Sequence, residues 1–373
     1  MKKVLLITAL VSSLSMADEK NLKLKIRLQP RIDFGEIMKE GDNYVNRSDF
    51  YIRRARLEVT KKFKNVPIGK ELKLNITLRM DKGERDYDYK KAKKDPGPFK
   101  TALHYAYADW KIGKAFSIRI GKSKKPFSRI SLTSSSRQLL IERPVSTETA
   151  KKWTGDYYGN HIMLHGKFIE GTIRYMLSIS DGSTIESVNK TGGDTITSHV
   201  NLGNFYAVRI ELSPPGMVEK KKDDTGIGEK NKGNVLSLGA SFARNTNFSV
   251  DSLNNETATV LGVDLFSRFY IGKGAFVVQA EYVDMSYKRL GRTEKGWYVQ
   301  GGYAIDTDNI GIMEPALRYE RIDYGTRNKD IVTIGFNHYI KMHRFKWAYN
   351  FVIIGEEEGG KRNVHQLQAQ IYF

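Results

Sequence analysis

The sequence predicts an all-β fold, a transmembrane antiparallel β-barrel of about sixteen strands. Apolar and polar residues alternate in segments of roughly ten residues from one end of the chain to the other. The connections between these segments alternate between short and long, as in membrane barrels. Mean hydropathy is −0.47, and no run of about 18 apolar residues follows the N-terminal segment, which argues against membrane-spanning helices.

The first 17 residues have the composition of an export signal. Lys2 and Lys3 precede an apolar run over residues 4–11, and the small residues Ser15 and Ala17 follow it. This order is typical of a secretory signal peptide, and the apolar run is too short for a spanning helix. We therefore expect residues 1–17 to be removed and residues 18–373 to form one barrel domain. The alternative is a mobile helical N-terminus on a cytoplasmic protein.

The alternation is clearest near the start of the expected mature chain. Leu24, Ile26 and Leu28 occupy one side of the segment, and Lys25 and Arg27 occupy the other. Successive side chains of a strand point to opposite faces, so this strand has an apolar face and a cationic face. Similar two-sided segments include residues 54–60, 72–81, 116–120, 206–212, 276–282 and 345–353.

The charged faces are expected to point into the lumen. An arginine or lysine on the lipid face of a barrel costs about 2–4 kcal/mol at the membrane midplane. The alternative for each cation is a salt bridge in the wall, with an acid such as Asp33, Glu58 or Asp81. The residues predicted to line the pore or to bind anions are Arg27, Arg31, Arg54, Arg56, Arg79, Arg119, Lys122, Lys124, Lys125, Arg129, Arg137 and Arg143.

The connections sort by length into two groups. A soluble β-sandwich or propeller would also show alternation, but no blade-length repeat is present. One connection, residues 214–232, should be short and is not; we interpret it as a polar insertion that the barrel tolerates. Short connections are expected near 113–114, 167–169, 271–274, 307–310 and 341–342, and long ones near 35–48, 82–100, 122–156, 181–202 and 245–257.

The charge balance indicates an anionic partner. The formal net charge of +19 falls to +17 when Lys2 and Lys3 are removed with the signal segment. An exported protein rarely meets nucleic acid, so the expected partners are small anions, phosphate among them, together with outer-membrane lipid and lipopolysaccharide. Cysteine is absent, which excludes disulfides and thiolate metal sites. We expect no cofactor and no metal.

Several stretches resemble the phosphate-selective porin O and P family. They cover the mature chain in order, and the chain ends in Phe373 on an alternating strand, a feature that resembles the signal read by barrel assembly machinery. The stretches are residues 50–57, 119–122, 125–128, 133–135 and 141–144, with later similarities at 238–241, 262–265, 280–282, 296–300 and 314–319. The resemblance implies a passive channel in the cell outer membrane, built as a homotrimer of 16-stranded barrels. It also implies that a long third outer loop, after Lys122, folds into each lumen.

The resemblance leaves phosphate specificity open. In phosphate-binding members, two lysines five residues apart lie around the Thr-Ser-Ser motif of the third loop. The matching positions here are Ser131 and Ser136, while Arg129 and Arg137 stand next to them. These arginines supply charge from different backbone positions. We therefore predict an anion-selective porin, and leave open whether phosphate or polyphosphate is bound specifically.

No enzyme motif is complete. Residues 121–123 resemble the end of a phosphate-binding loop, but Phe116 stands where glycine is needed. His161 and His165 lie on a strand without the glutamate of a helical zinc site, so we interpret them as structural histidines. No catalytic set is apparent. The competing functions are an outer-membrane barrel enzyme, of phospholipase or protease type, and a non-conducting structural or adhesive barrel.

Overall fold

A computed structural model describes residues 21–40, 43–80, 102–153, 158–181, 188–191, 194–198, 202–228, 233–250, 253–357 and 360–373. The expected signal peptide and the expected long connection at 82–100 lie outside these ranges. Neither of the two α-helices within them has the length and hydropathy needed to cross a membrane. These helices are α2 (Arg129–Leu132) and α3 (Val145–Trp153), and a short 3-10 helix, η2, covers Ile169–Gly171.

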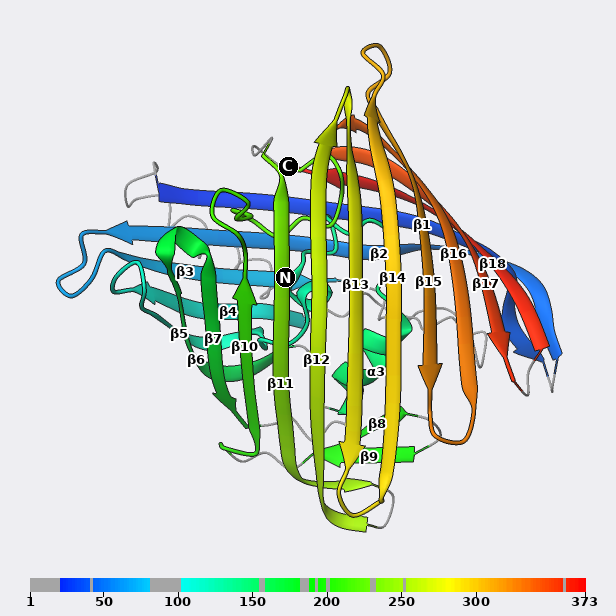
Figure 1. The fold of residues 1–373 in the computed structure, drawn as a ribbon, viewed down its shortest axis with the longest axis horizontal. Helices are drawn as coiled ribbons and strands as arrows, with labels where there is room; N and C mark the ends of the chain where they lie inside the picture. The colour runs from blue at the N-terminus through cyan, green and yellow to red at the C-terminus, as the bar shows by residue number, and fades with distance from the viewer. Residues whose placement is uncertain are drawn as a thin grey trace, which may run out of the picture.

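The described residues form eighteen strands in one antiparallel sheet that closes on itself (Figure 1). β1 pairs with β2 on one side and with β18 on the other. β7 pairs directly with β10, so sixteen strands form the wall and β8 with β9 form a separate hairpin beside β11. This confirms the predicted barrel. The strands are β1 (Leu22–Glu40), β2 (Asn43–Lys64), β3 (Glu71–Arg79), β4 (Ala102–Lys111), β5 (Ser117–Lys124), β6 (Tyr158–Phe168), β7 (Ile173–Ser180), β8 (Val188–Thr191), β9 (Asp194–Ser198), β10 (Phe205–Leu212), β11 (Val235–Val250), β12 (Leu253–Ile271), β13 (Gly274–Tyr287), β14 (Arg292–Asp306), β15 (Ile312–Asp323), β16 (Asn328–Lys341), β17 (Phe345–Glu356) and β18 (Gly360–Tyr372).

The two faces of the wall follow the predicted alternation. On β1, Leu24 and Ile26 are about half exposed on the outside, whereas Arg31 is 2% exposed on the inside. On β12, Leu265 is exposed and its neighbour Asp264 is buried. The aliphatic rows therefore face outward and do not meet in a core, as expected of a barrel in lipid.

The two ends of the barrel differ in their connections. We call the end where β1 begins and β18 ends the turn end; it lies at the top of β12 and β14 in Figure 1. The opposite end is the loop end. Two connections expected to be long there, at 35–48 and 245–257, are instead mostly strand, because β1 with β2 and β11 with β12 continue their ladders. Antiparallel strands keep hydrogen-bonding beyond the lipid band, where apolar alternation is no longer required.

A long loop from the loop end fills part of the lumen. We call residues 125–153, between β5 and β6, the inner loop. Its Ile130, Leu139 and Leu140 are at most 3% exposed, and α3 packs against β13–β15, behind which it appears in Figure 1. Glycines of the wall make room for it, since a Cβ on Gly302 would lie 2.9 Å from Leu139 Cδ1. The predicted third outer loop folded into the lumen is confirmed.

Placing a cation on the outer face tests the assignment of the two faces. Leu265→Arg should destabilise the barrel by about 2–4 kcal/mol, because Leu265 faces outward in the middle of the spanning part of β12. Ile271→Arg, on the same strand at the turn end, should cost about 0–1 kcal/mol because the side chain reaches the interface. Guanidinium unfolding of both variants in phospholipid vesicles measures the difference. Equal costs at the two positions would contradict an outward-facing Leu265.

Candidate functional site

Three predicted arginines form a row across the inner wall. The ladder places Arg27 of β1 opposite Arg56 of β2, and Arg56 opposite Arg79 of β3. Residues directly opposite in an antiparallel pair have Cβ atoms about 4.5–5.5 Å apart, where like charges destabilise the sheet. All three side chains are only half-buried. The row therefore weakens the wall and faces an accessible part of the lumen, which indicates a role other than stability. We call it the arginine row.

Uncharged groups hold Arg27 in place. Its guanidinium donates to the hydroxyls of Ser135 at 3.1 Å and Ser134 at 3.3 Å, both in the inner loop. It also lies 5.2 Å from the ring centroid of Tyr372. Hydroxyl and ring partners orient the guanidinium without cancelling its charge. The inner loop thus faces the arginine row with neutral acceptors.

Lys124 is held in the same way. Its ammonium donates to the backbone carbonyls of residues 131–133, at 2.7–3.0 Å. Arg143 donates to the carbonyl of Ile130 at 3.2 Å and to that of Thr133 at 3.2 Å. Arg143, Arg56 and Arg27 repel Lys124, and Asp224 attracts it more weakly. Positive charge is therefore concentrated where β1, β2 and β5 meet the inner loop.

A second group of arginines pairs with one carboxylate of the inner loop. Glu142 accepts from Arg53 Nε at 2.8 Å, forms an ion pair with Arg31, and lies 3.7 Å from Arg54 Nη2. Burial alone would raise the pKa of Glu142, but Arg53, Arg31 and Arg54 outweigh burial and hold that pKa well below its usual range. Arg31 also pairs with Asp33 at 2.5 Å. These arginines secure the inner loop to the wall.

The two loop arginines that stand in for the missing lysines are neutralised. Arg129 is 0% exposed and contacts Glu219 at 2.8 Å and Asp224 at 3.2 Å. Arg137 is 2% exposed and contacts Asp223 at 3.0 Å. All three acids belong to the connection between β10 and β11, within the stretch predicted to be a tolerated polar insertion. Charge on Arg129 and Arg137 is therefore matched within the protein.

The remaining predicted cations lie apart from the arginine row. Arg119 pairs with Asp109, with 2.8 Å between Arg119 Nε and the carboxylate. Lys125 lies with its ammonium 4.0 Å from the ring centroid of Phe205. Lys122 pairs in the ladders with Ala106 and Asn160, on the outward side that Ile120 and Ile162 also share. The geometry thus brings Arg27, Arg56, Arg79, Lys124 and Arg143 together and separates Arg119, Lys122 and Lys125 from them.

A sequence model of the phosphate-selective porin O and P family matches residues 24–373. The chain belongs to this family. An uncharacterized protein of Aquifex aeolicus (strain VF5) is 58% identical over 364 residues, covering 95% of this chain and 87% of the relative.

Two solved structures of outer-membrane proteins share the barrel fold. The anion-selective porin from Comamonas acidovorans is 9% identical, with a TM-score of 0.59, over 94% of this chain and 99% of that one. OmpT of Vibrio cholerae in its trimer form is 7% identical, with a TM-score of 0.60, over 94% and 99% of the two chains. At these identities the likeness shows the fold alone.

The family's loop pattern departs here in a defined way. Ser131 and Ser136, at the positions of the expected lysines, are each 1% exposed. Ser136 Oγ lies 3.0 Å from Ser134 Oγ, within the loop's own hydrogen bonding. A lysine at either position would bury an ammonium. At these two positions the inner loop of this chain is therefore packed into the interior of the protein.

Sequence reasoning missed several inward cations. Arg53 points inward together with Arg54 because a bulge lies opposite Gln29 and Pro30. Proline has no backbone N–H to donate to the neighbouring strand, and a bulge accommodates it. The extra residue of the bulge interrupts the regular alternation of the two faces. Other cations outside the predicted pore-lining set, all at most 4% exposed on the inside of β10, β12, β15, β17 and β18, are Arg209, Arg268, Arg318, Lys346 and Arg362. Parity with exposed apolar neighbours places Arg209 and Lys346 on the charged face of two segments already predicted to be two-sided, and the same rule identifies the others.

The wall opposite the arginine row carries acids. Arg209 pairs with Asp264 at 2.5 Å, and Arg318 pairs with Glu320 at 3.2 Å. Glu281 of β13 and Glu314 of β15 are also buried on this side. The lumen is therefore asymmetric: the side formed by β1–β5 has excess positive charge, and the side formed by β10–β17 mixes both signs.

One serine–histidine pair on the inside of the barrel has part of the geometry of a hydrolytic centre. Ser123 Oγ lies 2.7 Å from His161 Nε2. His161 Nδ1 is buried and has no hydrogen-bond partner among the described residues, so the orienting carboxylate of a triad is missing at that nitrogen. His165 pairs with Asp109 at 3.1 Å. In the described part of the chain no group of three or more potential ligands is arranged to hold a metal.

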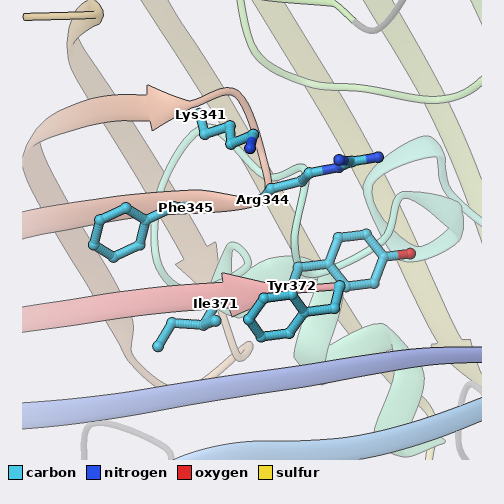
Figure 2. A pocket seen from close by; sticks show the side chains of 6 residues that line it. Lys341, Arg344, Phe345, Ile371 and Tyr372 are labelled. Carbon is cyan, nitrogen blue, oxygen red and sulfur yellow. The ribbon is translucent and has the colours of Figure 1, made fainter.

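A pocket of about 420 Å³ lies at the turn end, outside this charged region (Figure 2). It is formed by the connection between β16 and β17 together with the last residues of β18. Phe345 and Ile371 are cross-strand partners there, and Phe345 is 43% exposed on the outer face. The pocket is thus part of the apolar rim of the barrel and does not belong to the arginine row.

Two neighbouring carboxyls should respond to pH in opposite ways. Burial, with Glu219 and Asp223 close by, raises the pKa of Asp224 to about 7 despite Arg129. Burial acts the same way on Asp223, but His343 and Arg137 outweigh it and hold its pKa below the usual range. Folding therefore takes up a proton at Asp224 between about pH 4 and pH 7, and stability falls as pH rises through that window. Stability from Asp223 is present above about pH 4 and is lost as pH falls below it.

Melting temperatures from about pH 3 to pH 8 test this contrast. Relative to the wild type, Asp224→Asn should gain stability as pH rises from about 4 to 7, because the penalty for ionising Asp224 disappears. Asp223→Asn should be most destabilised above about pH 4, and its deficit should shrink in acid. Parallel curves for the two variants would refute the assigned environments.

Proposed function

We propose that this protein is a passive, anion-selective channel of the outer membrane, and that anions pass along the arginine row. The observation that carries the proposal is the cross-strand placement of Arg27, Arg56 and Arg79 on a half-buried inner surface. Rings or ladders of fixed positive charge lower the energy of an anion in a pore and raise that of a cation.

The partners of these cations support weak, exchangeable binding. Arg27 and Lys124 donate to hydroxyl and carbonyl oxygens, which are neutral acceptors that an anion can replace. The planar guanidinium can offer an oxyanion two parallel hydrogen bonds. Conduction requires several sites of modest affinity, so that an ion leaves one as it enters the next. Three arginines side by side fit that requirement.

The proposed solutes are small anions, with phosphate or polyphosphate as candidates. The buried loop arginines pair with acids, so we infer that the arginine row is the place where phosphate would be recognised.

The family to which the chain belongs supports an outer-membrane location, with the turn end facing the periplasm after export by residues 1–17. The trimer form of OmpT supports a homotrimer here. The outward aliphatic rows would contact lipid and lipopolysaccharide, and we propose no enzymatic activity.

Reversal potentials across a planar bilayer in a KCl gradient test anion selectivity. The wild type should prefer chloride over potassium. Arg27→Gln combined with Arg56→Gln should lower this preference at least about fivefold, because one charge at 4 Å in water is worth about that factor. Lys273→Gln, an exposed lysine at the turn end, removes charge outside the lumen and should leave the reversal potential unchanged. Potassium preference in the wild type would overturn the proposal, and absence of any current would favour a non-conducting structural barrel.

Phosphate recognition has a separate test in the same bilayer. Millimolar phosphate should reduce chloride current through the wild type, and this block should be lost in the Arg27→Gln/Arg56→Gln variant. The oxyanion binds where the guanidinium forks converge, so removing two of them removes the site. A chloride current that phosphate leaves untouched would show a general anion channel without phosphate recognition.

A further inference from the structure

A second segment enters the lumen from the end opposite to the inner loop. We call residues 213–228, which follow β10, the insertion. A connection at the turn end of a barrel is normally short. Here the six consecutive residues 223–228 are all buried, and Asp223, Asp224 and Thr225 are at most 1% exposed. A polar segment of this kind is buried only when other parts of the protein satisfy its polar groups.

The wall is shaped to receive the insertion. The backbone N–H of Gly226 donates to Glu314 Oε1 at 2.6 Å. A Cβ on Gly226 would lie 2.6 Å from Ala304 Cβ and 2.7 Å from the Ala275 carbonyl oxygen, so a residue without a side chain is needed there. Ile227 packs against Ala304 and Tyr339. The insertion therefore has a defined seat on β13–β16.

The insertion also meets the inner loop inside the barrel. The backbone N–H of Asp224 donates to the carbonyl of Arg137 at 2.9 Å. Asp224 Oδ1 accepts from the Thr133 hydroxyl at 3.1 Å, beside its contact with Arg129. Two segments that enter from opposite ends are thus joined by backbone and side-chain hydrogen bonds and by ion pairs.

The ion pairs of the insertion determine which cations in the lumen are available to bind an anion. Glu219 and Asp224 contact Arg129, and Asp223 contacts Arg137. Arg268 of β12 donates to the backbone carbonyls of Asp223 and Thr225, both at 3.2 Å. A carboxylate held in the same molecule has a high effective concentration, so a dilute anion cannot displace it. Arg27 of the arginine row donates instead to the hydroxyls of Ser135 and Ser134 in the inner loop.

We propose that the insertion is a specificity-determining element, which occupies the β10–β17 side of the lumen and withdraws Arg129 and Arg137 from the solute. Permeating anions are thereby confined to the arginine row on the opposite side. This inference rests on the proposed channel function. The insertion then has two separable effects. Its volume narrows the cross-section of the lumen. Its acids neutralise two cations that would otherwise bind anions tightly and slow their passage.

Two variants separate these effects. The amide variant, Glu219→Gln with Asp223→Asn and Asp224→Asn, keeps the volume and removes the charge. The deletion of residues 219–228 removes both. Asp308→Asn, an exposed acid of the turn end, is the control for loss of a negative charge. Circular dichroism of each purified protein verifies that the barrel is folded, and the deletion remains informative if the amide variant fails to fold.

The measurements are single-channel conductance and the reversal potential in a KCl gradient. The amide variant should raise the chloride-to-potassium permeability ratio about fivefold, the factor that one unit charge at 4 Å produces in water. The deletion should increase conductance. The deletion should also be blocked by lower phosphate concentrations than the wild type, because it uncovers Arg129 and Arg137 as well as removing their acidic partners. Asp308→Asn should match the wild type in every measurement.

The outcomes distinguish this inference from the channel function itself. Wild-type conductance, permeability ratio and phosphate block in both insertion variants would overturn the inference while leaving anion selectivity intact. A fall in conductance in the deletion would also overturn it, because the insertion would then assist passage. A cation-selective wild type would instead overturn the proposed function, whatever the variants do.

Discussion

The structure depends on one constraint: a strand that crosses lipid can place charge on only one of its faces. Lysine and arginine on the lipid side cost several kilocalories per mole at the midplane. With 61 lysines and arginines in the chain, the wall must turn many of them inward. The inside of the barrel is therefore crowded with cations, and their partners determine what the lumen can do.

Those partners divide the cations into two classes. Where a fixed carboxylate lies against a guanidinium, as Glu142 does beside Arg53 or Asp223 beside Arg137, the pair supports the packing of inserted segments. Where the partners are hydroxyls, carbonyls or other cations, as at Arg27 and Lys124, charge is left for a solute. Buried ion pairs contribute little net stability against apolar replacements. Their value here lies in fixing two loops in one arrangement.

The sequence predicts the wall better than it predicts what fills it. The period of two identifies the strands and the inward face of Arg27, Arg56 and Arg79, because lipid enforces that period on every spanning strand. It fails at Arg53, where a bulge beside Pro30 turns two adjacent residues inward. It also misplaces the outer ends of β1, β2, β11 and β12, since strands beyond the lipid need no alternation.

The insertion was beyond prediction for a different reason. Its run of lysine, aspartate and glycine has the composition of an exposed loop, and nothing local shows that Gly226 fits against Ala304. The role of its acids depends on their pairing with Arg129 and Arg137, which lie more than 75 residues away in the sequence. Pairing at such separations is set by the closed sheet, and it becomes visible only when the wall and both loops are placed together.

Thiol labelling tests the central claim most directly, because the chain has no cysteine of its own. Arg27→Cys and Ile26→Cys are neighbours on opposite faces of β1. A negatively charged, water-soluble thiol reagent added during bilayer recording should reduce chloride current stepwise through Arg27→Cys and leave current through Ile26→Cys unchanged. Current loss in Ile26→Cys with no effect at Arg27→Cys would contradict an anion path along the arginine row.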